Sequence, residues 1–291
     1  MAISGTTHKV GLIGWPVGHS FSPEIHNAAF SYCNLDYVYV PLPVEPSQLE
    51  QAVYGLKALG FSGANVTIPH KIAVMEYLDD IDATARLAGA VNTIVVEQGK
   101  LIGYNTDARG FITALQQNDF AVHGKRVLLL GAGGAARAVL AGLSSSGVAS
   151  VAVAARQTSQ AQQLVDLFPG VKVQSVLWPS NDFQQVLSQA DFIIQATPIG
   201  MYPHCEAMPQ LAIDNIKQAA VVCDLIYNPV TTKLLERSAA AGHQVLSGLS
   251  MLVEQAALAF EYWTGQAAPR QTMVQTARNL VLKNSSLLTN K

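Results

Sequence analysis

Residues 127–136 read VLLLGAGGAA, and this stretch decides the fold class of the segment around it. The continuous apolar run at its start is typical of a strand that is buried on both faces of a parallel sheet. The turn that follows fits the pattern GxGxxA, and residues 135–144 are predicted to form a helix. A strand, a glycine-rich turn and a helix in this order are typical of a dinucleotide-binding unit of the Rossmann type.

The glycines of this turn have separate expected roles. Gly131 permits the tight turn, and Gly133 lets the backbone approach a pyrophosphate at the N-terminus of the helix. An ordinary tight turn between a strand and a helix is the alternative for an isolated match of this kind.

The end of the next predicted strand indicates which dinucleotide binds. Residues 154–158 read AARQT and lack the acid that usually binds the ribose 2′-hydroxyl of NAD. Arg156 is instead placed to meet the 2′-phosphate of NADP. A solvated surface arginine is the alternative, and taken alone it would be the commoner case.

Outward from this stretch, short apolar runs alternate with segments of helical spacing, which predicts an α/β fold with parallel sheets. The predicted strands are residues 10–13, 37–41, 63–68, 127–130, 151–154, 192–195 and 220–225, with a hairpin formed by 94–96 and 101–103. Two long helices are expected near the C-terminal end, at 249–263 and 271–282. The polar stretch 118–125 predicts a domain junction.

The composition excludes several classes of protein. The chain has 291 residues, 49% of them hydrophobic and 13% charged, which is enough apolar material for the cores of two domains. The formal net charge is −2 and no basic run occurs, so no nucleic-acid partner is expected. No uninterrupted apolar run reaches about 18 residues, so no membrane span is expected. Three widely spaced cysteines without a CxxC pair favour reduced thiols, and we expect a cytoplasmic protein.

A second group of polar residues lies in the first 110 positions, close to the predicted strand ends. Ser20 and Ser22 precede a predicted helix, Lys71 follows a strand, and Asn92 and Asp107 flank the hairpin. Each has a simpler explanation, because Ser22 or Asp107 could cap a helix and Lys71 could be a solvated lysine. Together they favour a site for a small polyhydroxylated molecule at the carboxyl ends of the strands. No metal site is expected, because no histidine or carboxylate spacing typical of a metal site accompanies them.

These residues belong to motifs by which the sequence resembles the shikimate dehydrogenase family. The resemblance covers nearly the whole chain, and its motifs follow the family's order. They are Gly14-x-Pro16-x-x-His19-Ser20-x-Ser22-Pro23-x-x-His26-Asn27, Asn65-Val66-Thr67-x-Pro69-x-Lys71, Gly89-Ala90-Val91-Asn92-Thr93, Asn105-Thr106-Asp107, Gly131-Ala132-Gly133-Gly134-Ala135, Ala196-Thr197-Pro198-x-Gly200-Met201, Asp224-Leu225-x-Tyr227-x-Pro229 and Gly248-x-x-Met251-Leu252-x-x-Gln255-Ala256.

The resemblance implies an α/β protein with two domains. Residues 1–107 and 249–291 would form a discontinuous α/β substrate-binding domain, to which the C-terminal helices return. Residues 108–248 would form a Rossmann-type NADP-binding domain, with the active site in the cleft between the two. The implied activity is the reversible NADPH-dependent reduction of 3-dehydroshikimate to shikimate, in the pathway to chorismate and the aromatic amino acids. Oligomeric state is left open, a homodimer being one alternative.

The resemblance also implies a role for each site residue. Lys71 is the acid–base residue, paired with Asp107. The implied substrate-binding residues are Ser20 and Ser22 for the carboxylate, Thr67, Asn92, Asp107 and Gln255 for ring hydroxyls, and Lys71 and Tyr227. The implied cofactor-binding residues are Gly131, Ala132, Gly133, Gly134, Ala135, Arg156, Thr197, Leu225 and Gly248. A lysine ammonium in this role would stabilise the alkoxide charge that hydride transfer builds and would supply the proton.

The sequence departs from the family's pattern at two points. Trp15 stands where the family commonly has asparagine, and Gln160 stands where a second basic residue often follows the arginine. The second departure weakens the expected preference for NADP over NAD. One alternative is therefore a quinate/shikimate dehydrogenase with relaxed cofactor use. A catalytically silent regulator that binds NADP and shikimate is disfavoured, because Lys71 and Asp107 are both present.

Overall fold

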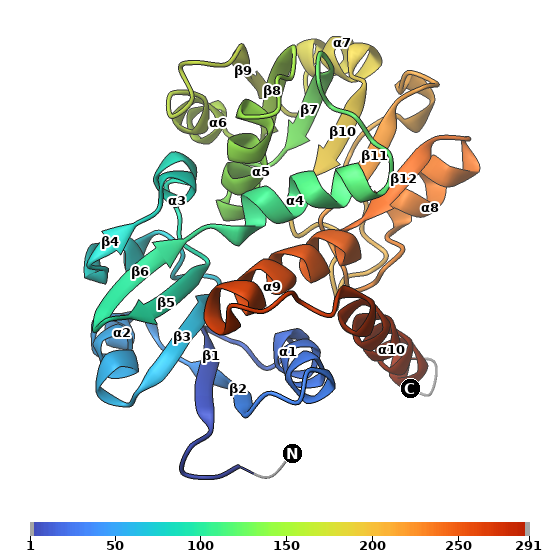
Figure 1. Cartoon of the computed structure of the whole chain (residues 1–291). Helices are drawn as coiled ribbons and strands as arrows, with labels where there is room; N and C mark the ends of the chain where they lie inside the picture. The colour runs from blue at the N-terminus through green and yellow to red at the C-terminus, as the bar shows by residue number, and fades with distance from the viewer. Residues whose placement is uncertain (1–2, 289–291) are drawn as a thin grey trace. The chain divides into compact units, whose positions relative to one another are not determined.

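The computed structural model describes residues 3–288, which fall into two compact units (Figure 1). Unit 1 comprises Met1–Gly110 and Val253–Lys291, and unit 2 comprises Phe111–Leu252. Within the described residues, no helix combines the length and the apolar character that are needed to cross a membrane.

Unit 2 contains a parallel sheet of six strands in the order β12-β11-β10-β7-β8-β9. The strands are β7 (Arg126–Leu130), β8 (Ser150–Ala155), β9 (Val173–Leu177), β10 (Phe192–Gln195), β11 (Val221–Asp224) and β12 (Gln244–Ser247). The chain adds β8 and β9 on one side of β7, then crosses back and adds the other three strands on the opposite side. Ligands of such sheets bind outside the carboxyl ends of the strands, where the strand order reverses. That position is the boundary between β7 and β10.

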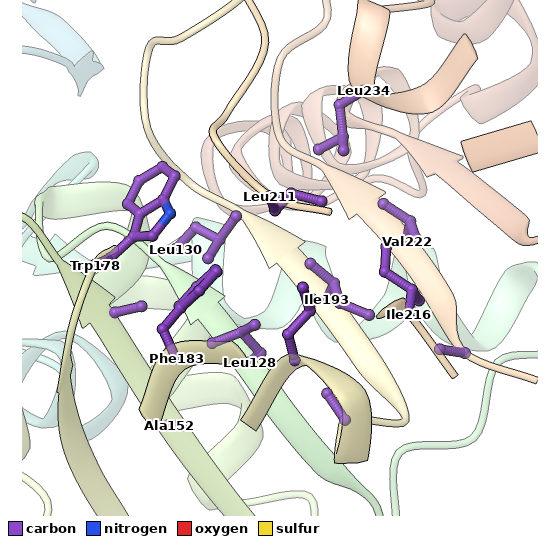
Figure 2. Packing of buried hydrophobic residues seen from close by; sticks show 14 of the residues in the cluster. Leu128, Leu130, Ala152, Trp178, Phe183, Ile193, Leu211, Ile216, Val222 and Leu234 are labelled. Atoms are coloured by element: carbon purple, nitrogen blue, oxygen red, sulfur yellow. The ribbon is translucent and has the colours of Figure 1, made fainter. Parts of the chain in front are cut away.

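The helices of unit 2 cover an apolar sheet. They are α5 (Gly134–Ser144), α6 (Thr158–Val165), α7 (Asn181–Gln189), α8 (Lys233–Ala240) and the larger part of α4 (Thr106–Gln117). In the core, Leu128 of β7 and Ile193 of β10 lie in one buried cluster with Phe183 of α7 and Trp178 (Figure 2). Each such side chain stabilises the fold by about 1.5–3 kcal/mol through burial. This packing gives the loops at the carboxyl ends a rigid base.

Unit 1 contains a second sheet of six strands, in the order β2-β1-β3-β5-β6-β4. The strands are β1 (His8–Gly14), β2 (Tyr37–Pro43), β3 (Phe61–Val66), β4 (Asp80–Ile81), β5 (Thr93–Glu97) and β6 (Lys100–Tyr104). β1, β2 and β3 are parallel, whereas β5 is antiparallel to both β3 and β6. The helices are α1 (Ser22–Tyr32), α2 (Leu49–Ala58), α3 (Ala83–Ala88), α9 (Gly248–Thr264, of which unit 1 holds the part from Val253) and α10 (Arg270–Leu288).

The predicted α/β class and the predicted hairpin are confirmed, and two local predictions are wrong. The strand predicted at 63–68 ends at Val66, since Pro69 has no N–H to donate to a sheet and Ile68 before it is exposed. Ser22 is not a helix cap: the helix begins at Ser22 itself, and Phe21 occupies the cap position without a side-chain hydrogen bond.

Candidate active site

Lys71 and Asp107 form an ion pair in unit 1. Lys71 Nζ donates to Asp107 Oδ2 at 2.5 Å, and the two side chains are only 20% and 9% exposed. Lys71 lies in the loop after β3, where its carbonyl accepts a hydrogen bond from the N–H of Val91 at 2.8 Å. Asp107 lies in the first turn of α4. Lys71 is therefore not a freely solvated lysine.

Asn92 fixes the start of the helix that carries Asp107. Its Oδ1 accepts the N–H of Thr106 at 2.7 Å, and its Nδ2 donates to Thr106 Oγ1 at 2.9 Å. Asn105 Oδ1 accepts the N–H of Ala108 at 3.1 Å. Two asparagines thus satisfy the first turn of α4, and the explanation of Asp107 as a helix cap is wrong. Since a backbone N–H can only donate, Asn92 Oδ1 must face Thr106, and one Nδ2 hydrogen is left to donate elsewhere.

Ser20 and Ser22 lie together at the start of α1. The N–H of Ser22 donates to Ser20 Oγ at 3.2 Å, and the Ser22 side chain is hydrogen-bonded to the hydroxyl of Tyr39. The Tyr39 hydroxyl accepts from Ser22 and donates its one hydrogen to Asn65 Oδ1 at 2.9 Å. Burial raises the pKa of the Tyr39 hydroxyl, so it remains a protonated donor. This buried chain of hydrogen bonds holds the two serines, and the sequence analysis did not identify Tyr39 or Asn65 as its members.

Thr67 and Gln255 occupy positions where two elements approach closely. The N–H of Thr67 donates to the carbonyl of Ile13 at 2.8 Å, which places Thr67 beside the end of β1. A Cβ built on Gly14 would lie 2.3 Å from Thr67 Cγ2. Gln255 lies on α9, and its backbone packs against Gly110 of α4. Unit 1 thus brings Thr67 to the strand ends and Gln255 to the helix that carries Asp107.

The glycine-rich turn of unit 2 lies at the reversal of strand order. Gly131 has φ +107°, which residues with a side chain rarely adopt, and a Cβ there would lie 2.9 Å from Thr197 Cγ2 after β10. A Cβ on Gly133 or Gly134 would meet nothing within 4 Å. Gly133 is the cap residue of α5 and offers no side chain to accept from the first N–H groups of the helix. This geometry fits the pyrophosphate of a dinucleotide.

The neighbouring strand ends carry the other predicted cofactor residues. Arg156 follows β8 directly and is exposed. A Cβ built on Gly248 would lie 2.1 Å from the carbonyl oxygen of Leu225, so the start of α9 touches the backbone after β11. Tyr227, a predicted substrate-binding residue, lies two positions farther along this loop and is partly buried.

Two buried side chains that the sequence analysis did not identify hold these loops. Gln195 Nε2 donates to the carbonyls of Thr197 and Ile199, both at 3.0 Å, and its Oε1 accepts the N–H of Thr197 at 2.7 Å. Asp224 accepts the N–H of Ile226 at 3.0 Å and the hydroxyl of Thr232 at 2.7 Å. The signal that could have found them is a polar residue as the last position of an otherwise apolar strand.

Burial raises the pKa of the Asp224 carboxyl to about 6, although its two hydrogen bonds act in the opposite direction. In the same strand, β11, burial also raises the pKa of the Cys223 thiol, which keeps it protonated and unreactive. No group of three or more histidine, cysteine, aspartate or glutamate side chains within residues 3–288 could hold a metal ion.

Comparison with known proteins gives matches along the whole chain. Residues 12–94 match the model of the shikimate dehydrogenase substrate binding domain, residues 114–229 that of shikimate / quinate 5-dehydrogenase, and residues 248–278 that of the shikimate 5′-dehydrogenase C-terminal domain. A shikimate dehydrogenase (NADP(+)) from Desulforamulus reducens is 43% identical over 285 residues, which cover 97% of this chain and 98% of the relative.

Solved structures agree with these matches. The crystal structure of a shikimate dehydrogenase in complex with NADP+ matches with a TM-score of 0.89 and 42% identity, over 96% of this chain and 98% of that chain. A shikimate 5-dehydrogenase from Listeria monocytogenes, in complex with shikimate and NAD, matches with a TM-score of 0.90 and 33% identity, over 94% and 98%.

Proposed function

The chain belongs to the shikimate dehydrogenase family, and from this premise we propose that it reduces 3-dehydroshikimate to shikimate, reversibly and with NADPH as the reductant. The observation that carries the proposal is the partly buried pair of Lys71 and Asp107, which this oxidoreductase activity needs and which a silent binding protein does not. The proposal places the enzyme in the cytoplasm, in the pathway to chorismate and the aromatic amino acids.

We assign substrate binding to a domain of residues 1–107 and 249–291, most of which lies in unit 1. The hydroxyls of Ser20 and Ser22 would donate to the substrate carboxylate. Ring hydroxyls would be held by Thr67, Asn92, Asp107 and Gln255, and Tyr227 of unit 2 would also bind the substrate. A site made of such groups discriminates strongly, because a substrate that lacks one hydroxyl leaves a buried polar group without a partner.

We assign cofactor binding to a domain of residues 108–248, most of which lies in unit 2. The pyrophosphate would lie on the N–H groups of Gly131 to Ala135, and Arg156 would bind the 2′-phosphate. Thr197, Leu225 and Gly248 would lie on the nicotinamide side. Open space at Gly133 and the uncapped start of α5 support this fit. Bound NADPH would supply the hydride that reduces the ketone carbon.

Lys71 would then complete the reaction with a proton. Negative charge develops on the ketone oxygen as the hydride arrives, and the Lys71 ammonium stabilises that charge and donates its proton to the oxygen. In the reverse direction neutral Lys71 takes the proton from the substrate hydroxyl. Asp107 orients the ammonium through the hydrogen bond at 2.5 Å and accepts from a ring hydroxyl with its remaining lone pairs.

The test is to identify the product in the reductive direction. The full chain is incubated with 3-dehydroshikimate and NADPH, and the organic product is identified by NMR. We expect shikimate in amounts equal to the NADPH consumed. Absence of shikimate, with the chain folded and NADPH bound, would contradict the proposal.

A second candidate is a quinate/shikimate dehydrogenase with relaxed cofactor use. It is favoured by the match of residues 114–229 to the shikimate / quinate model and by the NAD in the Listeria structure. Only Arg156 offers a positive charge within residues 154–160, which limits the preference for NADP.

A homodimer is the assembly to test first, by sedimentation of the purified chain at several concentrations.

A further inference from the structure

Gly110 lies where α4 touches α9. A Cβ built on this residue would lie 2.8 Å from the backbone nitrogen of Gln255, 3.0 Å from its Cβ and 3.1 Å from its Cα. Carbon atoms do not approach backbone atoms so closely without displacing them. The two helices reach this separation only because residue 110 has no side chain.

The contact lies between two groups that are assigned to the substrate. Asp107 precedes Gly110 by three residues on α4, so both lie on one face of the helix. The residue that Gly110 touches is Gln255 itself, not a neighbour of it. The separation of the helices at Gly110 therefore sets the distance between the Asp107 carboxylate and the Gln255 amide.

α4 cannot move away from the contact without losing other bonds. Its first turn is tied to Asn92 through the N–H of Thr106 at 2.7 Å. Asn105, which caps α4 by accepting the N–H of Ala108 at 3.1 Å, also donates through Nδ2 to the carbonyl of Ala90 at 2.9 Å. A shift of α4 would break these hydrogen bonds and would carry Asp107 away from Lys71.

α9 is held by contacts with two other elements. The indole of Trp263 donates to the carbonyl of Ile94 in β5 at 3.0 Å, and a Cβ on Gly63 of β3 would lie 2.4 Å from the indole nitrogen. Arg270 of α10 donates to Glu254 at 3.0 Å and to Glu261 at 2.7 Å, both on α9. A side chain at position 110 would therefore have to displace a helix that is bonded to its surroundings.

We propose that Gly110 is a positioning residue, whose missing side chain holds Asp107 and Gln255 at the spacing that the substrate ring requires. This inference rests on the proposed function, which assigns ring hydroxyls to both residues. It predicts that even a methyl group at position 110 weakens shikimate binding and slows turnover while cofactor binding is kept. A displacement of about 1 Å can reduce an enzymatic rate on the order of 100-fold.

The experiment compares Gly110→Ala with Gly55→Ala in the full chain. Gly55 is also a helix glycine of unit 1, in α2, but a Cβ there would meet nothing within 4 Å. For each variant the dissociation constants of shikimate and NADP are measured by calorimetry, and kcat and KM by NADP reduction. For Gly110→Ala we expect the shikimate dissociation constant and KM to rise about 10-fold or more and kcat to fall, with the NADP constant unchanged. Gly55→Ala should match the wild type in all four.

In a helix interior, alanine is normally more stable than glycine. If Gly110 had only a structural role, its replacement by alanine would therefore not weaken shikimate binding selectively. If Gly110→Ala does not fold, Arg270→Lys replaces it, because lysine keeps the charge but loses the fork that holds α9 at two points. We expect the same selective loss of shikimate affinity in this variant. The inference is overturned if a folded Gly110→Ala binds shikimate with a dissociation constant and a KM within twofold of the wild type. Where Arg270→Lys replaces that variant, the same result in Arg270→Lys overturns it. A wild type that does not oxidise shikimate would instead overturn the proposed function.

Discussion

The proposed acid–base role belongs to one residue, Lys71, and can be tested by removing its amine. Lys71→Ala leaves the substrate oxygen without a proton donor in the transition state. We expect kcat to fall by about 10²–10⁴-fold with a much smaller change in KM, measured as initial rates of NADP reduction with shikimate.

The control is Lys57→Ala in the same unit. Lys57 also pairs with an aspartate, Asp79, at 3.2 Å, but both side chains are more than a third exposed. This variant should keep the kcat of the wild type. A Lys71→Ala enzyme that is as active as Lys57→Ala would make Lys71 an ordinary ion-pair residue.

We propose that the preference for NADP over NAD depends on Arg156, which is exposed after β8. A charge-assisted hydrogen bond to the 2′-phosphate is worth about 1.5–3 kcal/mol, or about 10–150-fold in kcat/KM. We expect the wild-type ratio of kcat/KM for NADP over NAD to lie in that range and to collapse towards one in Arg156→Ala. Arg237→Ala, at an exposed arginine of α8, should leave the ratio unchanged. A ratio that Arg156→Ala does not move would show that this residue does not bind the phosphate.

Asp224, which holds the loop after β11, makes the stability of the folded chain depend on pH. Its pKa is about 6 in the folded chain, above the ordinary value of 3.8. Between pH 3.8 and pH 6 the Asp224 carboxyl is therefore protonated in the folded chain and ionised in the unfolded chain. The contribution of Asp224 to stability is therefore present below about pH 4 and is lost as the pH rises through 6. Asp224→Asn should remove this dependence, so that the stability of the wild type relative to the variant falls by on the order of 3 kcal/mol across the window. Urea unfolding at several pH values measures it.

Asp191→Asn is the control for this sign. At Asp191 burial is outweighed by hydrogen bonds from the N–H of Arg126 and from Lys217, and the pKa is lowered. Its contribution to stability is present above the ordinary pKa and is lost as the pH falls. When the free energy of unfolding is plotted against pH as the difference between wild type and variant, the two variants should thus give slopes of opposite sign. Equal slopes would contradict the account of Asp224.

At the scale of elements, the central strands could be predicted, whereas among the edge strands only β2 was predicted, at residues 37–41. Residues 127–130 of β7 and 192–194 of β10 are continuous apolar runs, because both faces of these strands are buried. β9 lies at the edge of its sheet and reads VQSVL, whose mixture of polar and apolar residues resembles a loop. β12 at the other edge has four residues, and β4 has two. Such strands are defined by their neighbours, which a local pattern does not contain.

α1 is packed through a buried histidine, and this makes its stability depend on pH. The His26 ring stacks on Tyr39 with centroids 4.5 Å apart, and among the described residues neither ring nitrogen has a hydrogen-bond partner. Burial lowers the His26 pKa from 6.5 to about 3. The stability that neutral His26 provides is present above pH 6.5 and is lost as the pH falls towards 3.

His26→Phe keeps an aromatic ring against Tyr39 and removes the titration. We expect the variant to lose less stability than the wild type as the pH falls from 6.5 towards 3, with a difference of several kcal/mol over the window. Chemical unfolding at intervals of pH checks it. Parallel loss of stability in the two proteins would show that His26 is not neutral in the folded chain.

At the scale of the whole molecule, the residues proposed to contact a ligand were easier to predict than those that hold them. Lys71, Asp107 and the glycine-rich turn lie in short motifs at strand ends. Tyr39, Gln195 and Asp224 act through contacts with other elements, and a polar residue at the end of an apolar strand does not by itself indicate which groups it will bind. Their role depends on which strands become neighbours in the sheet.

The central claim is that this chain is an NADP-dependent oxidoreductase for shikimate, and one set of initial rates tests it most directly. Reduction of NADP and of NAD is followed with shikimate and with quinate, each at saturating and limiting concentrations, using one preparation of the full chain. We expect the highest kcat/KM for shikimate with NADP, about 10-fold or more above shikimate with NAD, and a lower value for quinate with either cofactor. No reduction of NADP with shikimate, or a higher kcat/KM for quinate with NAD, would contradict the account.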